Sequence, residues 1–306
     1  MKAKLYITPE TFKYNHNTST ENVMERIASL TELINFVIPR QEDVFYLNWT
    51  GLYETELFEG LTIDDIITDS VSSIFHDIQT FVLSILAQCE QIQDTKESIE
   101  SIVNNQLDCA IIVFNEYEGN VNKENQIIAN IDEWYKYHRS YLYLHPYENC
   151  EDYLCEVKKY FENIVIHDSV KAGLKTVYST HLRRITQSLI LLNDNLLDNF
   201  QKSKYDDFIE FLREFESKYS NIIDGASFLN SYDNDSKKKQ FKVVFFIKGE
   251  YKEYICNPHI KLNSNDDGVP HQYCRIYFAP VKKIDTCILI GFICKHKNSR
   301  SGKRKH

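Results

Sequence analysis

Glycine and proline are both scarce in this chain, with nine and six copies among 306 residues. So few turn-forming residues argue against a turn-rich all-β sandwich and against long disordered linkers. No apolar run is long enough to span a bilayer, and the N-terminal residues do not have the pattern of a secretory leader. We therefore expect a cytoplasmic protein with no membrane partner, long enough for two folded domains.

Motifs for phosphate-binding loops and for metals are missing as well. The sequence contains no GxxxxGK[ST], no GxGxxG and no HExxH, so nucleotide binding through those loops is unsupported. Its eight cysteines include no CxxC pair, and the spacing of Cys150 and Cys155 does not suit structural zinc. We expect reduced, mostly buried thiols, no metal and no cofactor.

Strand-like and helix-like patterns alternate through the first half of the chain. Apolar residues from Val23 to Val37 recur at helical spacing and stop before Pro39. Further helices are predicted over 62–86 and about 124–140, and strands over 3–8, 44–47 and 108–115. This alternation predicts a mixed α/β domain over residues 1–150.

The order of elements changes after a boundary near Pro146. A short strand over 163–167 is followed by helical patterns from Val170 to Tyr219. Four strand-like runs close the chain, over 241–247, 251–262, 273–278 and 286–294. Short connections demand antiparallel pairing, so residues 160–306 should form helices packed on a four-stranded antiparallel sheet. The predicted fold class is therefore α+β.

Charge is distributed very unevenly. Residues 237–306 hold sixteen Lys and Arg against five Asp and Glu, a balance of +11. Residues 1–236 hold nineteen against thirty-nine, a balance of −20. This asymmetry indicates a polyanion-binding C-terminal region and an acidic sensor or regulatory domain over 1–150.

Three segments in the C-terminal third carry a resemblance to a known family. They are the run YICNPHIKL over 254–262, RIYF over 275–278, and ILIGFICKH over 288–296. Together they resemble the RelE/HigB mRNA interferase toxins, and the resemblance covers about 160–306. It implies a metal-independent endoribonuclease that acts on RNA, including ribosome-bound mRNA. It further implies anti-phage defence or a toxin–antitoxin setting, with an antitoxin or another defence protein as partner.

The residues of these segments can be interpreted chemically without the family. Strand alternation places His259 and Lys261 on one face, and Arg275 and Tyr277 on one face. Imidazole can exchange protons near neutral pH, whereas guanidinium and ammonium groups bind phosphate. The candidate catalytic residues are therefore His259, Lys261, Arg275, Tyr277 and His296. The candidate RNA-binding residues are Lys295, Lys297, Arg300, Lys303 and Arg304.

Each candidate also has a purely structural interpretation. His259 could pack in a turn beside Pro258, and Arg275 could pair with an acidic neighbour such as Asp267. At the level of function, the main alternative to a nuclease is a non-catalytic RNA- or ribosome-binding regulator with the same basic sheet. An interaction protein whose basic end docks on an acidic partner is the third hypothesis.

Overall fold

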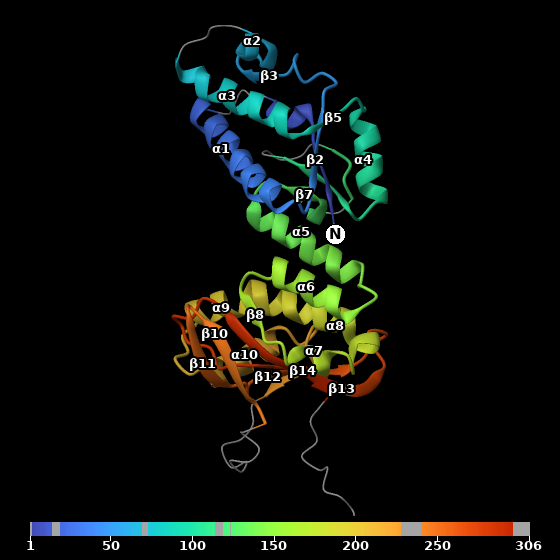
Figure 1. The fold of residues 1–306 in the computed structure, drawn as a ribbon, viewed down its shortest axis with the longest axis vertical. Helices are drawn as coiled ribbons and strands as arrows, with labels where there is room; N and C mark the ends of the chain where they lie inside the picture. The colour runs from blue at the N-terminus through green and yellow to red at the C-terminus, as the bar shows by residue number, and fades with distance from the viewer. Residues whose placement is uncertain are drawn as a thin grey trace, which may run out of the picture. The chain divides into compact units, whose positions relative to one another are not determined.

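The protein has a mixed α+β fold, described by a computed structural model over residues 2–13, 19–68, 73–113, 119–122, 124–227 and 240–295. The chain divides into two compact units, Met1–Tyr141 and Leu142–His306 (Figure 1). Among the described helices, none combines the length and the apolar character needed to cross a membrane.

Unit 1 is built on a five-stranded parallel sheet. Strand β1 (Lys4–Ile7) is central, with β2 (Val44–Asn48) and β5 (Glu90–Ile92) on one side and β6 (Cys109–Ile112) and β7 (Ile127–Ile128) on the other. The chain thus completes one side before it crosses to the other, which is the doubly wound arrangement. Its switch point lies between β1 and β6. A separate pair, β3 (Glu56–Phe58) and β4 (Leu61–Thr62), is antiparallel.

Helices cover both faces of this sheet. Helix α4 (Lys96–Asn105) packs Ile99 and Val103 against Tyr6 and Ile111 on one face. Helices α1 (Thr20–Val37) and α3 (Ser73–Gln88) contact each other on the other face (Figure 1). The remaining elements are α2 (Ile63–Thr68), α5 (Ile131–Leu144), and the short 3-10 helices η1 (Pro9–Phe12), η2 (Ile38–Arg40) and η3 (Glu124–Gln126).

A buried carboxylate ties α5 to the amino ends of two strands. The side chain of Asp43, just before β2, is fully buried. Its oxygens accept hydrogen bonds from Ala3 N at 2.8 Å and Trp134 Nε1 at 2.6 Å, and one lies 2.9 Å from His138 Nε2. Three partners satisfy this carboxylate, so it acts as a structural clamp.

Unit 2 contains a five-stranded mixed sheet in the order β8-β14-β13-β12-β9. Strand β8 (Ile164–Ile166) is parallel to β14 (Ile288–Lys295). The other neighbours are antiparallel: β14 with β13 (Pro270–Phe278), β13 with β12 (His259–Ser264), and β12 with β9 (Gly225–Ser227).

The prediction of one four-stranded antiparallel sheet over 241–294 is wrong. Strands β10 (Lys242–Ile247) and β11 (Glu250–Ile255) form a separate hairpin, turning at Lys248 and Gly249, both with positive φ. The apolar run that the sequence suggested as a single strand, 251–262, is broken at Pro258. Proline has no N–H for a ladder, so the chain leaves the hairpin there and enters the larger sheet as β12.

Helices of unit 2 precede most of these strands. They are α6 (Cys150–Tyr160), α7 (Val170–Leu174), α8 (Tyr178–Leu191), the π-helical turn η4 (Leu192–Leu196), α9 (Leu197–Lys202) and α10 (Phe208–Lys218). Phe208 of α10 meets Phe278 of β13 edge-on, with ring centroids 6.1 Å apart. Helix α7 approaches β14 so closely that a Cβ on Gly173 would lie 2.7 Å from the Cβ of Cys294. Only glycine permits this contact.

Candidate functional site

Four of the predicted site residues lie together on one face of the unit 2 sheet. In the register of β12 and β13, His259 is opposite Tyr277 and Lys261 is opposite Arg275. Directly opposite side chains on one face have Cβ atoms about 4.5–5.5 Å apart. The sheet therefore gathers an imidazole, an ammonium, a guanidinium and a phenol in one two-by-two patch, which we call the sheet-face patch.

Arg275 carries the most informative geometry in the sheet-face patch. It is 6% exposed, and burial lowers the pKa of its guanidinium. Nη1 donates to Asn263 Oδ1 at 3.0 Å and to the Cys274 carbonyl at 2.8 Å. Nε is buried without a partner, and Nη2 donates no hydrogen bond to the described part of the chain. The side-on fork of the guanidinium, formed by Nε and Nη2, is therefore unfilled.

No carboxylate of the described residues forms an ion pair with Arg275. The alternative partner considered from sequence, Asp267, instead accepts from Asn265 Nδ2 at 3.3 Å. Tyr273 lies beside the guanidinium, with the cation 5.4 Å from its ring centroid. Asp224 attracts the guanidinium through a Coulombic interaction but forms no ion pair with it. Burying a cation without an ion-pair partner is costly, so this arrangement suits an anion supplied from outside.

The rings of His259 and Tyr277 are in contact in the same patch, tilted by 39° to one another. Their ring centroids are 4.7 Å apart, and both side chains are buried. The Nδ1 atom of His259 is 3.1 Å from the Asn257 carbonyl. Because a carbonyl only accepts, Nδ1 carries the proton and the basic nitrogen of the neutral ring is Nε2. Burial raises the pKa of Tyr277, so its phenol stays protonated and can donate.

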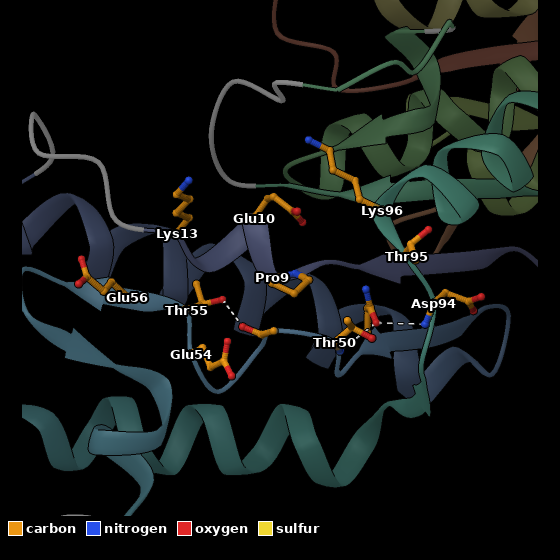
Figure 2. A pocket seen from close by; sticks show the side chains of 12 residues that line it. Pro9, Glu10, Lys13, Thr50, Glu54, Thr55, Glu56, Asp94, Thr95 and Lys96 are labelled. Atoms are coloured by element: carbon orange, nitrogen blue, oxygen red, sulfur yellow. Dashed lines mark hydrogen bonds between the residues drawn. The ribbon is translucent and has the colours of Figure 1, made fainter.

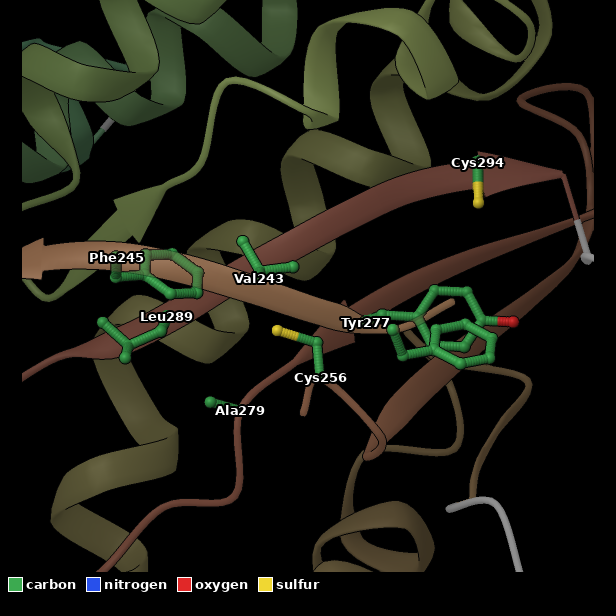
Figure 3. Packing of buried hydrophobic residues seen from close by; sticks show 8 residues of the cluster. Val243, Phe245, Cys256, Tyr277, Ala279, Leu289 and Cys294 are labelled. Carbon is green, nitrogen blue, oxygen red and sulfur yellow. The ribbon is translucent and has the colours of Figure 1, made fainter. Parts of the chain in front are cut away.

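The hairpin covers the rest of this face. Val243 and Phe245 of β10 pack with Cys256, Ala279 and Leu289 in an apolar cluster that also includes Tyr277. Figure 3 shows Tyr277 at the edge of that cluster, with its hydroxyl directed away from Leu289 and Phe245. Cys256 packs directly against the backbone of Gly291 in β14. A Cβ at position 291 would collide with Cys256, so this contact requires glycine. The hairpin thus supports the apolar side of Tyr277 and leaves its polar end outside the cluster.

Of the remaining predicted residues, only Lys295 belongs to the described part of the chain, and it lies off the patch. Lys295 is exposed at the end of β14, and its register partner is Cys274, so it lies on the opposite face from Arg275. His296, Lys297, Arg300, Lys303 and Arg304 lie outside the described residues.

Two residues of the site were not predicted from sequence. Asn263 orients Arg275, and it continues the alternating series of His259 and Lys261 along β12, a signal that could have identified it. Asp224 accepts from Arg184 Nη2 at 3.0 Å and from Ser264 N at 3.3 Å, and its own N–H donates to the Lys261 carbonyl at 2.9 Å. These contacts of Asp224 join segments that are far apart in the sequence, and no local pattern encodes such a pairing.

Metal ligation finds no support in the described part of the chain. No group of three or more His, Cys, Asp or Glu side chains there could hold an ion. The eight cysteines are free, and burial raises the pKa of Cys274 and Cys256. We find no match to any family model, curated protein or solved structure.

Proposed function

We propose that unit 2 is a RelE/HigB-like ribonuclease that cleaves RNA with the RNA's own 2′-OH, and that unit 1 is a sensor domain that regulates it. The observation that carries this proposal is the unfilled fork of buried Arg275, on the same face as His259 and Lys261. A phosphodiester has two non-bridging oxygens spaced for such a fork.

The chemistry assigns a role to each side chain. The Nε2 atom of His259 takes the proton of the 2′-OH, and the 2′-oxygen then attacks the adjacent phosphorus. As the P–O5′ bond breaks, its electron pair stays on the 5′-oxygen, which takes a proton from an acid supplied by Tyr277 or His296. Arg275 and Lys261 stabilise the charge that builds up on the pentacoordinate phosphate. The products are a 2′,3′-cyclic phosphate and a 5′-hydroxyl.

Charge supports RNA as the partner. The balance of +11 over residues 237–306 supplies a long-range attraction for a polyanion, with Lys295, Lys297, Arg300, Lys303 and Arg304 as the proposed backbone contacts. Ribosome-bound mRNA fits the proposal as substrate, and a toxin–antitoxin or anti-phage setting fits it as context. An antitoxin or defence protein would be the matching protein partner. The balance of −20 over residues 1–236 suits restraint of the nuclease by the acidic part of the same chain.

The experiment is to incubate the full chain with a defined RNA in EDTA, with and without ribosomes, and to identify the new ends. We expect a 2′,3′-cyclic phosphate. His259→Ala should slow cleavage by about 10²–10⁴-fold, the usual worth of a proton-transfer group. The matched control is His76→Ala, an exposed histidine of α3, which should cleave like the parent.

Two outcomes would redirect the proposal. Cleavage that needs a divalent metal or yields 5′-phosphates contradicts the 2′-OH mechanism. RNA binding with no cleavage in any format favours the runner-up, a non-catalytic RNA- or ribosome-binding regulator with the same basic sheet.

A further inference from the structure

A pocket of about 660 Å³ opens at the carboxyl edge of the unit 1 sheet. It is formed by the loops that follow three parallel strands: β1, β2 and β5. Doubly wound sheets bind ligands outside the carboxyl ends of their strands, at the switch point, and β1 flanks that point here. The volume lies within the range of small-molecule sites, roughly 300–1,000 Å³.

Asn48, the last residue of β2, is a built feature of this pocket. It lines the pocket yet is only 3% exposed. Its Oδ1 accepts from Thr50 N at 3.1 Å and from Asp94 N at 3.4 Å. These two donors fix the amide orientation, because a flipped amide would oppose N–H to N–H. The Nδ2 amine forms no hydrogen bond within the described residues, so two donors are left for a ligand.

The segment after β1 adds one unsatisfied oxygen to the lining. Glu10 lines the pocket, and its Oε2 is buried without a partner in the described structure. Buried polar atoms are nearly always hydrogen-bonded, so the unpartnered Glu10 oxygen beside the Asn48 NH₂ group points to a polar ligand.

The charge of the lining decides which ligand fits. The lining has a formal charge of −2, because it contains four carboxylates and two lysines. They are Glu10, Glu54, Glu56, Asp94, Lys13 and Lys96. Figure 2 shows Glu10 and Lys96 on one side of the pocket and Glu54 and Thr50 on the other. The amino end of α4, at Lys96, contributes only about half a positive charge. The carboxylates therefore prevail, and they disfavour a phosphorylated ligand.

Hydroxyl groups are what such a lining can bind. A carboxylate only accepts, and a ribose diol offers two adjacent O–H donors, the same chemistry by which an acid at a doubly wound sheet reads a ribose. The Asn48 amine donates, so it needs an acceptor such as a ring nitrogen or a carbonyl of a base. We propose that this pocket binds a ribonucleoside without phosphate, with Glu10 on the ribose hydroxyls and Asn48 on the base.

The test is calorimetric titration of the full chain with adenosine, guanosine, cytidine and uridine, each beside its 2′-deoxy and 5′-monophosphate forms. We expect one ribonucleoside to bind, and its 2′-deoxy and 5′-phosphate forms to bind at least tenfold more weakly. Tighter binding of a monophosphate overturns the inference that phosphate is excluded. Equal binding of the deoxy form overturns ribose recognition, and no binding by any member overturns the site.

Two variants locate the ligand. Asn48→Asp keeps the acceptor for Thr50 N and Asp94 N but replaces the amine, so it should weaken binding by at least tenfold without unfolding the unit. Glu10→Gln should also weaken binding, whereas Glu59→Gln, an exposed residue between β3 and β4, should not. Binding that is unchanged in both pocket variants would place the nucleoside elsewhere. Because the readout is binding, failure here leaves the nuclease proposal of unit 2 untouched.

Discussion

Asp43 in unit 1 and Arg275 in unit 2 are both charged and buried, but they differ in how completely their polar atoms are hydrogen-bonded. In unit 1, Asp43 is met by three groups: Ala3 N, Trp134 Nε1 and His138 Nε2. In unit 2, Arg275 has only Nη1 engaged, while Nε is buried without a partner. A buried charge whose polar atoms are all hydrogen-bonded stabilises the fold. A buried charge with unpartnered polar atoms can still bind a ligand. Counting partners therefore separates a structural residue from a candidate site residue.

The largest expected effect is on stability. Asp43→Ala leaves the polar groups of Trp134 and His138 buried without their carboxylate, so it should lower the free energy of unfolding by about 3–5 kcal/mol. Urea unfolding followed by tryptophan fluorescence measures this. The control is Asp132→Ala, at an exposed aspartate of α5, the helix that carries Trp134 and His138. Its free energy of unfolding should stay within about 0.5 kcal/mol of the parent. A loss of less than 1 kcal/mol for Asp43→Ala would remove the structural half of the comparison.

Arg275→Met should give the reverse profile. It removes a cation that the fold does not fully pair and keeps the apolar stem, so unfolding should change by no more than about 1 kcal/mol. Cleavage should fall about a hundredfold, which corresponds to about 2.7 kcal/mol of transition-state stabilisation. Arg183→Met, at an exposed arginine of α8, is the control for both measurements. A several-kcal/mol loss of stability would make Arg275 a structural residue like Asp43.

Sequence reasoning anticipated the local elements better than their assembly. Alternation placed His259 with Lys261, and Arg275 with Tyr277, because strand geometry alone sets which side chains share a face. The register that brings those two pairs onto one face depends on the contacts between strands, which no local pattern records. The same limit explains the missed parallel pairing of β8 with β14.

The pocket in unit 1 was missed for a related reason. Asn48 ends β2, Glu10 lies in η1 after β1, and Asp94 follows β5, so only the strand order brings these residues to one edge. None of them belongs to a recognisable motif. The short strand β5 was also not predicted. Its sequence, Glu-Gln-Ile, begins a charged stretch that is typical of an exposed helix face.

The salt dependence of binding should differ between the two proposed ligands, RNA and a ribonucleoside. With about four phosphate contacts, RNA binding to unit 2 should weaken with a log–log slope near −3. Lys261→Met should reduce the slope by about 0.7, the value for one single-strand phosphate contact. A neutral nucleoside releases no counterions from unit 1, so its affinity should hardly change. Anisotropy and calorimetry over a salt series test both, and two equal slopes would contradict the distinction.

The smallest effect concerns an exposed ion pair at the start of α6. Lys175 and Lys171 donate to Glu151 at 2.9 and 3.0 Å, which lowers the pKa of that carboxyl to about 2. The stabilisation is complete above the unfolded pKa, about 4.3, and is lost as pH falls towards 2. Urea midpoints at pH 6, 4 and 3 should therefore drop further for the parent than for Glu151→Gln. Glu148→Gln, also exposed, should follow the parent. Parallel pH profiles of parent and Glu151→Gln would show that the pair contributes nothing.

The pairing of β8 with β14 also has a consequence for synthesis. Strand β8 lies near the beginning of unit 2, and its ladder partner is the last described strand of the chain. Contacts between such distant segments form late and slowly, because a long loop must close first. A nascent polypeptide therefore cannot complete this sheet until β14 has left the ribosome. Arg275, on β13, acquires its β14 neighbour Cys294 only then. The sheet that carries the sheet-face patch therefore stays incomplete until almost the whole described chain has been made.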